Sequence, residues 1–334
     1  MTQKSQGIPY PVLAARDAMA TRFEILLPAG DPLHLRAAAE EALDEIARLE
    51  NQLSRHRPTS ELSHLNARGA TGPVRLDPRL FRLLRTAQEL CRHTDGAFDP
   101  TVAPLLDCWG FTSGQPRIPS DDELRDVARR LGPDQIVLDP ATGTVRLAQP
   151  GVGLDLGAIG KGYAVDRAVE ILRDLGIESG LLHAGTSTAC AWGKPPGGGS
   201  WRIGVPRPDA ARRGLTAKAL AEAAAPGAEN PNAAALLTTI ELHDEALSVS
   251  AVWGRAFRVG GESFGHVLDP RTGRPVSANL MAAVVCDSAT EADALSTALL
   301  VLGTPGVEML SRGRPGFRAL VVPASPHIAH AASV

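Results

Sequence analysis

The sequence predicts an α+β fold in which helices pack on antiparallel sheets. Two patterns predict it. Apolar residues recur at helical spacing in long segments, most clearly at 35–53, and short apolar stretches come in pairs around turn residues, as at 135–139 and 144–148. Paired short strands are typical of hairpins, whose strands run antiparallel. With 334 residues, of which 44% are hydrophobic and 21% charged, the chain has the composition of a globular protein with a large core.

The helices are predicted from apolar spacing together with capping residues. Asp77 stands as an N-cap before a proline, capping boxes occur at 120–123 and 288–291, and Gly176 follows another helix as its C′ residue. The predicted helices are 35–53, 78–91, 120–132, 158–175 and 288–302.

The strands are predicted from short apolar or alternating runs bounded by turn residues. They are 21–27, 135–139, 144–148, 180–184, 201–205, 236–243, 246–250, 282–287 and 317–322. Residues 207–233 are rich in alanine and lack any periodicity, so we expect a mobile insertion there.

Composition argues against two classes of partner. The net charge is −3, the signs are scattered and aromatic residues are few, so no nucleic-acid partner is expected. No apolar stretch reaches membrane-spanning length, and the first ten residues lack the apolar core of a signal peptide. We therefore expect no membrane segment and a cytoplasmic chain, or a periplasmic one if a leader was removed. The four cysteines are isolated, and reduced thiols are expected.

The stretch 151–162 combines one acid, Asp155, a run of glycines and a single cation, Lys161, at the point where a helix begins. Such a loop can direct backbone N–H groups, a helix N-terminus and an ammonium at one anion, and a phosphate is the natural guest. The glycine positions match neither a Walker loop nor a Rossmann fingerprint. A glycine-rich turn that packs a helix onto a strand is the alternative.

Asp293 and Thr297 stand four residues apart in the predicted helix 288–302, so their oxygen atoms share one face. A carboxylate and a hydroxyl are hard ligands of the kind that Mg²⁺ accepts while it keeps waters and substrate phosphates. A solvated polar face is the alternative. If Asp293 approached the loop at 155–161, the two would form a metal–pyrophosphate site.

Four segments carry the most specific patterns in the sequence. They read Gly-Ala-Phe-Asp-Pro (96–100), Leu-Asp-Leu-Gly-Ala-Ile-Gly-Lys-Gly-Tyr-Ala-Val-Asp (154–166), His-Val-Leu-Asp-Pro-Arg-Thr-Gly-Arg-Pro-Val (266–276) and Ala-Asp-Ala-Leu-Ser-Thr-Ala (292–298). In this order they resemble the motifs of the ApbE-type FAD:protein FMN transferases. The resemblance extends from Met19 to Gly303.

This resemblance implies Mg²⁺-dependent transfer of FMN from FAD to a threonine hydroxyl, with release of AMP. The implied acceptor is a flavoprotein with an Asp-x-x-Thr-type site. Asp-Ser-Ala-Thr at 287–290 resembles such a site, but the same residues cap a predicted helix, so a structural role is expected there.

The resemblance also implies the site residues. The positions implied to contact FAD are Met19, Ala97, Phe98, Asp99, Asp155 and Lys161, with His56 at a flavin-stacking position and Leu268 acting through its backbone. The implied metal ligands are the carbonyl of Ala158 and the side chains of Asp293 and Thr297. His266 matches the histidine implicated in catalysis, as base or acceptor-positioning group, and Lys161 would neutralise developing charge.

A duplicated T-fold-like architecture is implied for the whole. Because the motifs extend from 19 to 297, we expect a single catalytic domain at 16–325, built of two interleaved halves, with tails at 1–15 and 326–334.

Several positions differ from the residues usual in this family. Ala20 replaces a glycine, His56 an aromatic residue, and Ser296 an acid found in some members; 183–187 and 248–250 replace Asn-x-Gly-Gly-Asp and Thr-Ser-Gly. The differences concern acceptor recognition more than FAD and metal binding. They leave two alternatives open, an Mg²⁺-dependent FAD pyrophosphatase that yields FMN and AMP, and a non-catalytic flavin-binding protein.

Overall fold

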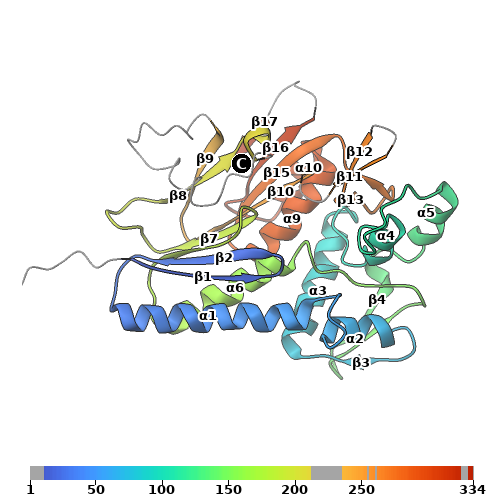
Figure 1. The fold of residues 1–334 in the computed structure, drawn as a ribbon, viewed down its shortest axis with the longest axis horizontal. Coiled ribbons are helices and arrows are strands. Elements are labelled where there is room, and N and C mark those ends of the chain that lie inside the picture. The colour runs from blue at the N-terminus through green and yellow to red at the C-terminus, as the bar shows by residue number, and fades with distance from the viewer. Residues whose placement is uncertain (1–10, 212–234, 254–255, 260–261, 325–329, 334) are drawn as a thin grey trace, which may run out of the picture. The chain divides into compact units, whose positions relative to one another are not determined.

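The computed structural model describes residues 11–211, 235–253, 256–259, 262–324 and 330–333 (Figure 1). The chain divides into two compact units, each made of two segments. They are Met1–Arg48 with Ala164–Ala246, and Leu49–Tyr163 with Leu247–Val334. Antiparallel strands and helices occur in both units, which confirms the α+β class. Most of the segment expected to be a mobile insertion, 207–233, lies outside the described residues; the short helix α7 (Pro208–Ala211) is at its start.

The first unit contains four antiparallel strands in the order β1-β2-β6-β7. They are β1 (Val12–Ala18), β2 (Thr21–Leu27), β6 (Gly180–Ala184) and β7 (Thr188–Trp192). A separate antiparallel ribbon pairs β8 (Trp201–Pro206) with β9 (Leu236–Leu242). Arg16 of β1 forms ion pairs with Glu40 and Asp44 of helix α1 (Pro32–Leu53). This links the helix to the strand.

The second unit contains the strand order β10-β15-β16-β17. These strands are β10 (Ala246–Ala251), β15 (Asn279–Cys286), β16 (Arg318–Pro323) and β17 (His330–Ser333). Helix α9 (Ala289–Leu302) packs on β15, and α10 (Pro305–Ser311) packs on α9. Ten of the 14 residues of α9 are buried, because its alanines and leucines lie on most sides of the helix. Thr290, Asp293 and Ser296 are the buried polar residues of that helix.

The second unit also contains smaller elements and the loop that leads to α6 (Gly160–Asp174). A three-stranded sheet has the order β3 (Val74–Arg75), β5 (Thr144–Leu147), β4 (Ile136–Asp139). Two hairpins pair β11 (Ala256–Val259) with β12 (Glu262–Gly265), and β13 (Leu268–Asp269) with β14 (Arg274–Pro275). The helices are α2 (Glu61–Arg68), α3 (Pro78–His93), α4 (Ala103–Cys108), α5 (Asp121–Ala128) and the 3₁₀ turn η1 (Pro133–Gln135). The predicted caps of α3, α5 and α9 are present, because Asp77, Ser120 and Ser288 each accept a first-turn N–H.

Three expectations about the ends of elements need correction. β1 begins at Val12, inside the stretch 1–15 expected to be a tail, and β17 lies inside 326–334. Both strands are held by pairing with a neighbour, β2 and β16 respectively, which a single run of sequence does not reveal. α5 ends at Ala128 rather than at Gly132, because a turn and η1 intervene.

Among the described residues, no helix has the length and apolar character needed to cross a bilayer.

Candidate active site

The loop before α6 is held in place by three neighbours from two parts of the second unit, helix α2 and the segment 100–102. The side chain of Asn66 pairs with the backbone of Leu154 in both directions, accepting its N–H at 2.8 Å and donating to its carbonyl at 2.9 Å. The next residue, Asp155, donates its N–H to the carbonyl of Pro100 at 2.8 Å. Gly153 forms a parallel bridge with Val102. The backbone at 153–155 is therefore fixed before the glycines at 157, 160 and 162.

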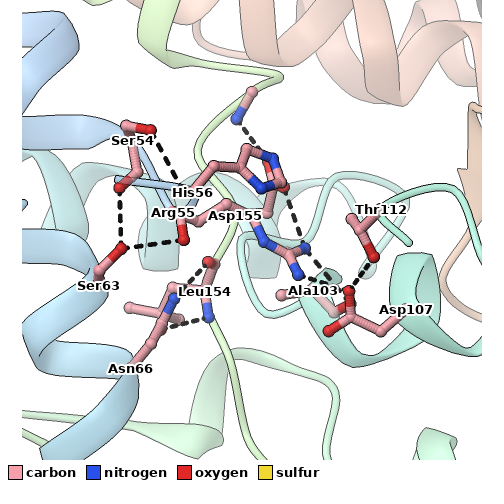
Figure 2. Close-up of polar contacts among 11 residues, drawn as sticks. Ser54, Arg55, His56, Ser63, Asn66, Ala103, Asp107, Thr112, Leu154 and Asp155 are labelled. Carbon is pink, nitrogen blue, oxygen red and sulfur yellow. Dashed lines mark hydrogen bonds and ion pairs between the residues drawn. The ribbon is translucent and has the colours of Figure 1, made fainter. Parts of the chain in front are cut away.

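The carboxylate of Asp155 has two different partners (Figure 2). Its Oδ1 accepts the N–H of Gly157 at 2.7 Å, and its Oδ2 lies 3.3 Å from the guanidinium of Arg55. Arg55 also donates to Asp107 at 2.6 Å, and Asp107 accepts a hydrogen bond from the hydroxyl of Thr112. Asp155 thus shapes the turn at Gly157 and joins a charged cluster.

Lys161 and Gly162, at the start of α6, both meet the carboxylate of Asp293. The ammonium of Lys161 lies 3.4 Å from Oδ1 and 3.5 Å from Oδ2, and the N–H of Gly162 donates to Oδ2 at 3.0 Å. Lys161 also donates to the carbonyl of Gly157 at 3.0 Å. The structure therefore brings the cation, the helix N-terminus and a buried carboxylate to one place, as the metal–pyrophosphate hypothesis required.

Glycine is needed at position 162 for this meeting. A Cβ there would lie 2.0 Å from the carbonyl oxygen of Ala289 and 2.8 Å from Cβ of Asp293. Only a residue without a side chain lets the first turn of α6 approach the first turn of α9 this closely.

Hydroxyl groups from β10 and α9 complete the surroundings of Asp293. The hydroxyl of Ser248 donates to Oδ1 of Asp293 at 3.5 Å. The hydroxyl of Ser296 lies 3.3 Å from that of Ser248 and 2.8 Å from that of Ser250. Thr297 lies 3.1 Å from Ser250 and donates to the carbonyl of Asp293 at 3.3 Å. The residues that replace the usual Thr-Ser-Gly and the third acid of some relatives thus form one hydroxyl network.

The residues of the 96–100 motif face inward. Ala97, Phe98 and Asp99 are all buried. The carboxylate of Asp99 accepts bonds from the hydroxyl of Thr101 at 2.6 Å and from the N–H of Gly132 at 2.8 Å. Burial raises the pKa of Asp99, and these hydrogen bonds oppose the rise. The carboxylate of Asp99 thus ties this loop to Thr101 and Gly132, and its predicted contact with FAD stays a prediction.

The other predicted site residues occupy varied positions. In the second unit, His266 is half-buried and directly follows β12, Leu268 is buried in a cluster with Leu105 and Trp109, and His56 is exposed. Ala158 lies in the turn before α6, next to Lys161. Met19 belongs to the first unit, where it occupies the turn between β1 and β2. The predicted roles of all these residues in binding or catalysis stay predictions.

Sequence reasoning missed three residues that hold the loop, namely Arg55, Asp107 and Asn66. Their partners are distant in the chain, with 100 positions between Arg55 and Asp155 and 88 between Asn66 and Leu154. The sequence signal for Arg55 and Asn66 was the polar character of the stretch 54–66, which comprises the turn after α1 and most of α2. Among the described residues, no three His, Cys, Asp or Glu side chains gather in a way that could hold a metal ion.

Comparison with known proteins identifies the family. The model of the ApbE family matches residues 19–321 of the chain. The chain belongs to the ApbE family. Two relatives named FAD:protein FMN transferase come from Klebsiella pneumoniae, at 28% identity over 81% of this chain and 77% of the relative, and Treponema pallidum, at 29% identity over 86% and 77%.

Solved structures of ApbE proteins share the fold. The ApbE protein of Thermotoga maritima has a TM-score of 0.82 and 28% identity, and covers 97% of both chains. The apo form of the flavinyl transferase ApbE of Pseudomonas stutzeri has a TM-score of 0.79 and 25% identity, over 97% of this chain and 95% of that one. The predicted ApbE architecture is therefore present in this chain.

Proposed function

We propose that this chain is an enzyme, an FAD:protein FMN transferase that uses Mg²⁺. The observation that carries the proposal is the meeting of Lys161, the N–H of Gly162 and the buried carboxylate of Asp293 at the start of α6. An ammonium and a helix N-terminus suit the anionic phosphates of FAD, and a carboxylate suits a metal that neutralises them. The named activity of the ApbE relatives supports the same assignment.

The residues around Asp293 fit Mg²⁺. The candidate ligand atoms are all oxygens, from the carboxylate of Asp293 and from the hydroxyl of Thr297 one turn later. The carbonyl of Ala158, three positions before Lys161, is the third candidate. One carboxylate with neutral oxygens leaves coordination positions for waters and substrate phosphates, which is how Mg²⁺ binds in phosphoryl-transfer sites. When bound, the metal would neutralise charge on the pyrophosphate.

The proposed reaction is a single displacement at phosphorus. The threonine oxygen of the acceptor attacks the FMN phosphorus of FAD, a new P–O bond forms, and the P–O bond to AMP breaks with its electron pair leaving on AMP. The hydroxyl proton passes to a base, for which we assign the imidazole of His266. Lys161 stabilises the negative charge on the phosphates.

The acceptor would be a separate flavoprotein with an Asp-x-x-Thr-type site. Thr290, in the chain's own Asp-Ser-Ala-Thr segment, is buried in the first turn of α9, and Ser288 of that segment caps the helix. A threonine in that position cannot reach the site without unfolding the helix that carries Asp293.

The proposal is tested by incubating the purified chain with FAD, Mg²⁺ and an acceptor domain that carries an Asp-x-x-Thr-type site. We expect an FMN-sized mass gain on the acceptor and stoichiometric AMP, both abolished by chelation of the metal and by Asp293→Ala. Asp287→Asn, which alters an exposed acid just before α9, is the matched control and is expected to keep activity.

The other outcomes separate the alternatives. AMP and free FMN without labelled acceptor would replace the transferase with an FAD pyrophosphatase. Bound FAD without any AMP would replace it with a non-catalytic flavin-binding protein.

A further inference from the structure

The backbone around Arg55 is fixed by a group of serines (Figure 2). The hydroxyl of Ser63 donates to the carbonyl of Ser54 at 3.1 Å and to that of Arg55 at 2.9 Å, and Ser60 also donates to the carbonyl of Ser54. The hydroxyl of Ser54 accepts the N–H of His56 at 3.2 Å. Four local hydrogen bonds therefore aim the side chain of Arg55, although it leaves from a turn between two helices.

The guanidinium of Arg55 lies between two carboxylates. One amino group donates to Asp107 at 2.6 Å, and the other lies 3.3 Å from Asp155. Only 12% of the Arg55 side chain and 17% of the Asp155 side chain is exposed, whereas Asp107 is 53% exposed. The inner pair is shielded from water, so its attraction is stronger than that of a surface ion pair. Asp107, at the outside, anchors the arginine by the shorter bond.

The orientation of Asp155 has consequences for the rest of the loop. Its second oxygen accepts the N–H of Gly157, and the carbonyl of Gly157 accepts from Lys161. A rotation of the carboxylate would release the turn at Gly157 and with it one partner of the ammonium that faces Asp293. Arg55 restrains that rotation, because it holds the oxygen that Gly157 does not use.

We propose that Arg55 is a positioning residue for FAD binding, which orients Asp155 and is itself anchored by Asp107. The inference rests on the proposed function in one respect, namely that FAD is the ligand of this loop. Loss of a hydrogen bond to a charged group costs enough free energy to weaken binding by about tenfold or more.

The variants Arg55→Gln, Asp107→Asn and the double variant test this chain of contacts. Binding is measured by the change in FAD fluorescence on titration with protein, and KM for FAD and kcat are measured separately. We expect Arg55→Gln to raise the Kd and KM for FAD about tenfold or more, with a smaller change in kcat. Asp107→Asn should give a smaller rise and add nothing in the double variant, because it acts only through Arg55.

Arg57→Gln is the matched control, since Arg57 lies two positions away, is half-exposed and pairs with Glu50. It is expected to leave the Kd for FAD unchanged. Arg55→Lys should recover only part of the affinity, because an ammonium cannot donate to two carboxylates in the planar arrangement of a guanidinium. Circular dichroism confirms that each variant is folded at the temperature of the titration.

Three results would overturn the inference. They are an unchanged Kd for FAD in Arg55→Gln, fully additive effects of Arg55→Gln and Asp107→Asn, and failure of the wild-type chain to bind FAD. A wild-type chain that binds FAD in an Arg55-dependent way but labels no acceptor would refute the proposed transferase and leave the positioning role supported.

Discussion

The turn between β1 and β2 holds two residues in a backbone conformation that favours glycine. Met19 and Ala20 have φ values of 50° and 59°, and they join Ala18 to Thr21 across the hairpin. A two-residue turn with both φ values positive is the type I′ hairpin turn, in which asparagine and glycine are preferred. Ala20, where the family usually has glycine, therefore carries strain next to a residue predicted to contact FAD.

Ala20→Gly is expected to raise the free energy of unfolding by about 1 kcal/mol, because it relieves the left-handed strain at a smaller entropic cost. Urea denaturation measures the change. Ala15→Gly, the same substitution inside β1, is the control and should lower stability by roughly 0.5–1 kcal/mol. Equal loss of stability in both variants would show that the turn is not strained.

His183 of β6, where the family usually has asparagine, gives the fold a dependence on pH. Its Nε2 lies 3.2 Å from Glu24. Burial lowers the pKa of His183 below its ordinary 6.5, and the attraction of Glu24 opposes this only in part. As the pH falls, the unfolded chain takes up the proton first. The stabilising contribution of the neutral ring is thus complete above about pH 6.5 and is lost as the pH falls below it.

We expect the wild-type chain to lose more unfolding free energy than His183→Asn between about pH 8 and about pH 5.5. Asparagine does not titrate, so the difference between the two curves isolates the histidine. Urea denaturation at several pH values provides the measurement. Parallel curves would mean that His183 binds its proton equally well in the folded and unfolded chains.

Between elements, the candidate site depends on the close approach of α6 and α9 at Gly162. Gly162→Ala would place a methyl group 2.0 Å from a backbone oxygen of α9. We expect a loss of about 2 kcal/mol or more in unfolding free energy, together with a large loss of FMN transfer, because Asp293 and Lys161 would be pushed apart.

Gly160→Ala is the matched control for that substitution. A methyl group at this position would meet only Cδ1 of Leu53 at 3.9 Å, an ordinary contact. Urea denaturation and the transfer assay should therefore distinguish two glycines in the same turn. Similar behaviour of both variants would contradict the assignment of a close helix–helix approach to Gly162.

How much of each element could be predicted depended on where its stabilising contacts lie. The bounds of α1 and α3 and the caps at Ser120 and Ser288 follow from local spacing and local hydrogen bonds, and they were predicted closely. β1 and β7 were missed, since their alanine-rich sequences owe their conformation to neighbouring strands. For the same reason the loop residues Asp155 and Lys161 could be singled out from the local glycine-rich pattern, whereas Arg55 and Asp107, which join the loop only through contacts distant in the sequence, could not.

For the whole molecule, the fold is retained although most residues differ from those of its relatives. The ApbE protein of Thermotoga maritima has a TM-score of 0.82 at 28% identity. Agreement of this kind is expected when the volume and pattern of the core are kept while individual apolar residues change. The candidate site of the second unit draws on both of its segments, with Asp155 and Lys161 from the first and Asp293 and Thr297 from the second.

The separation of Lys161 from Asp293 also bears on how the protein is made in the cell. The two residues are 132 positions apart, so at roughly 5–20 residues per second a ribosome needs about 7–26 s to add the second after the first. During that interval the nascent chain has the loop proposed to bind the phosphates but lacks the carboxylate proposed to hold the metal. The proposed transferase is therefore expected to stay inactive until Asp293 has been added, and a message truncated before the codon for Asp293 should yield no active product.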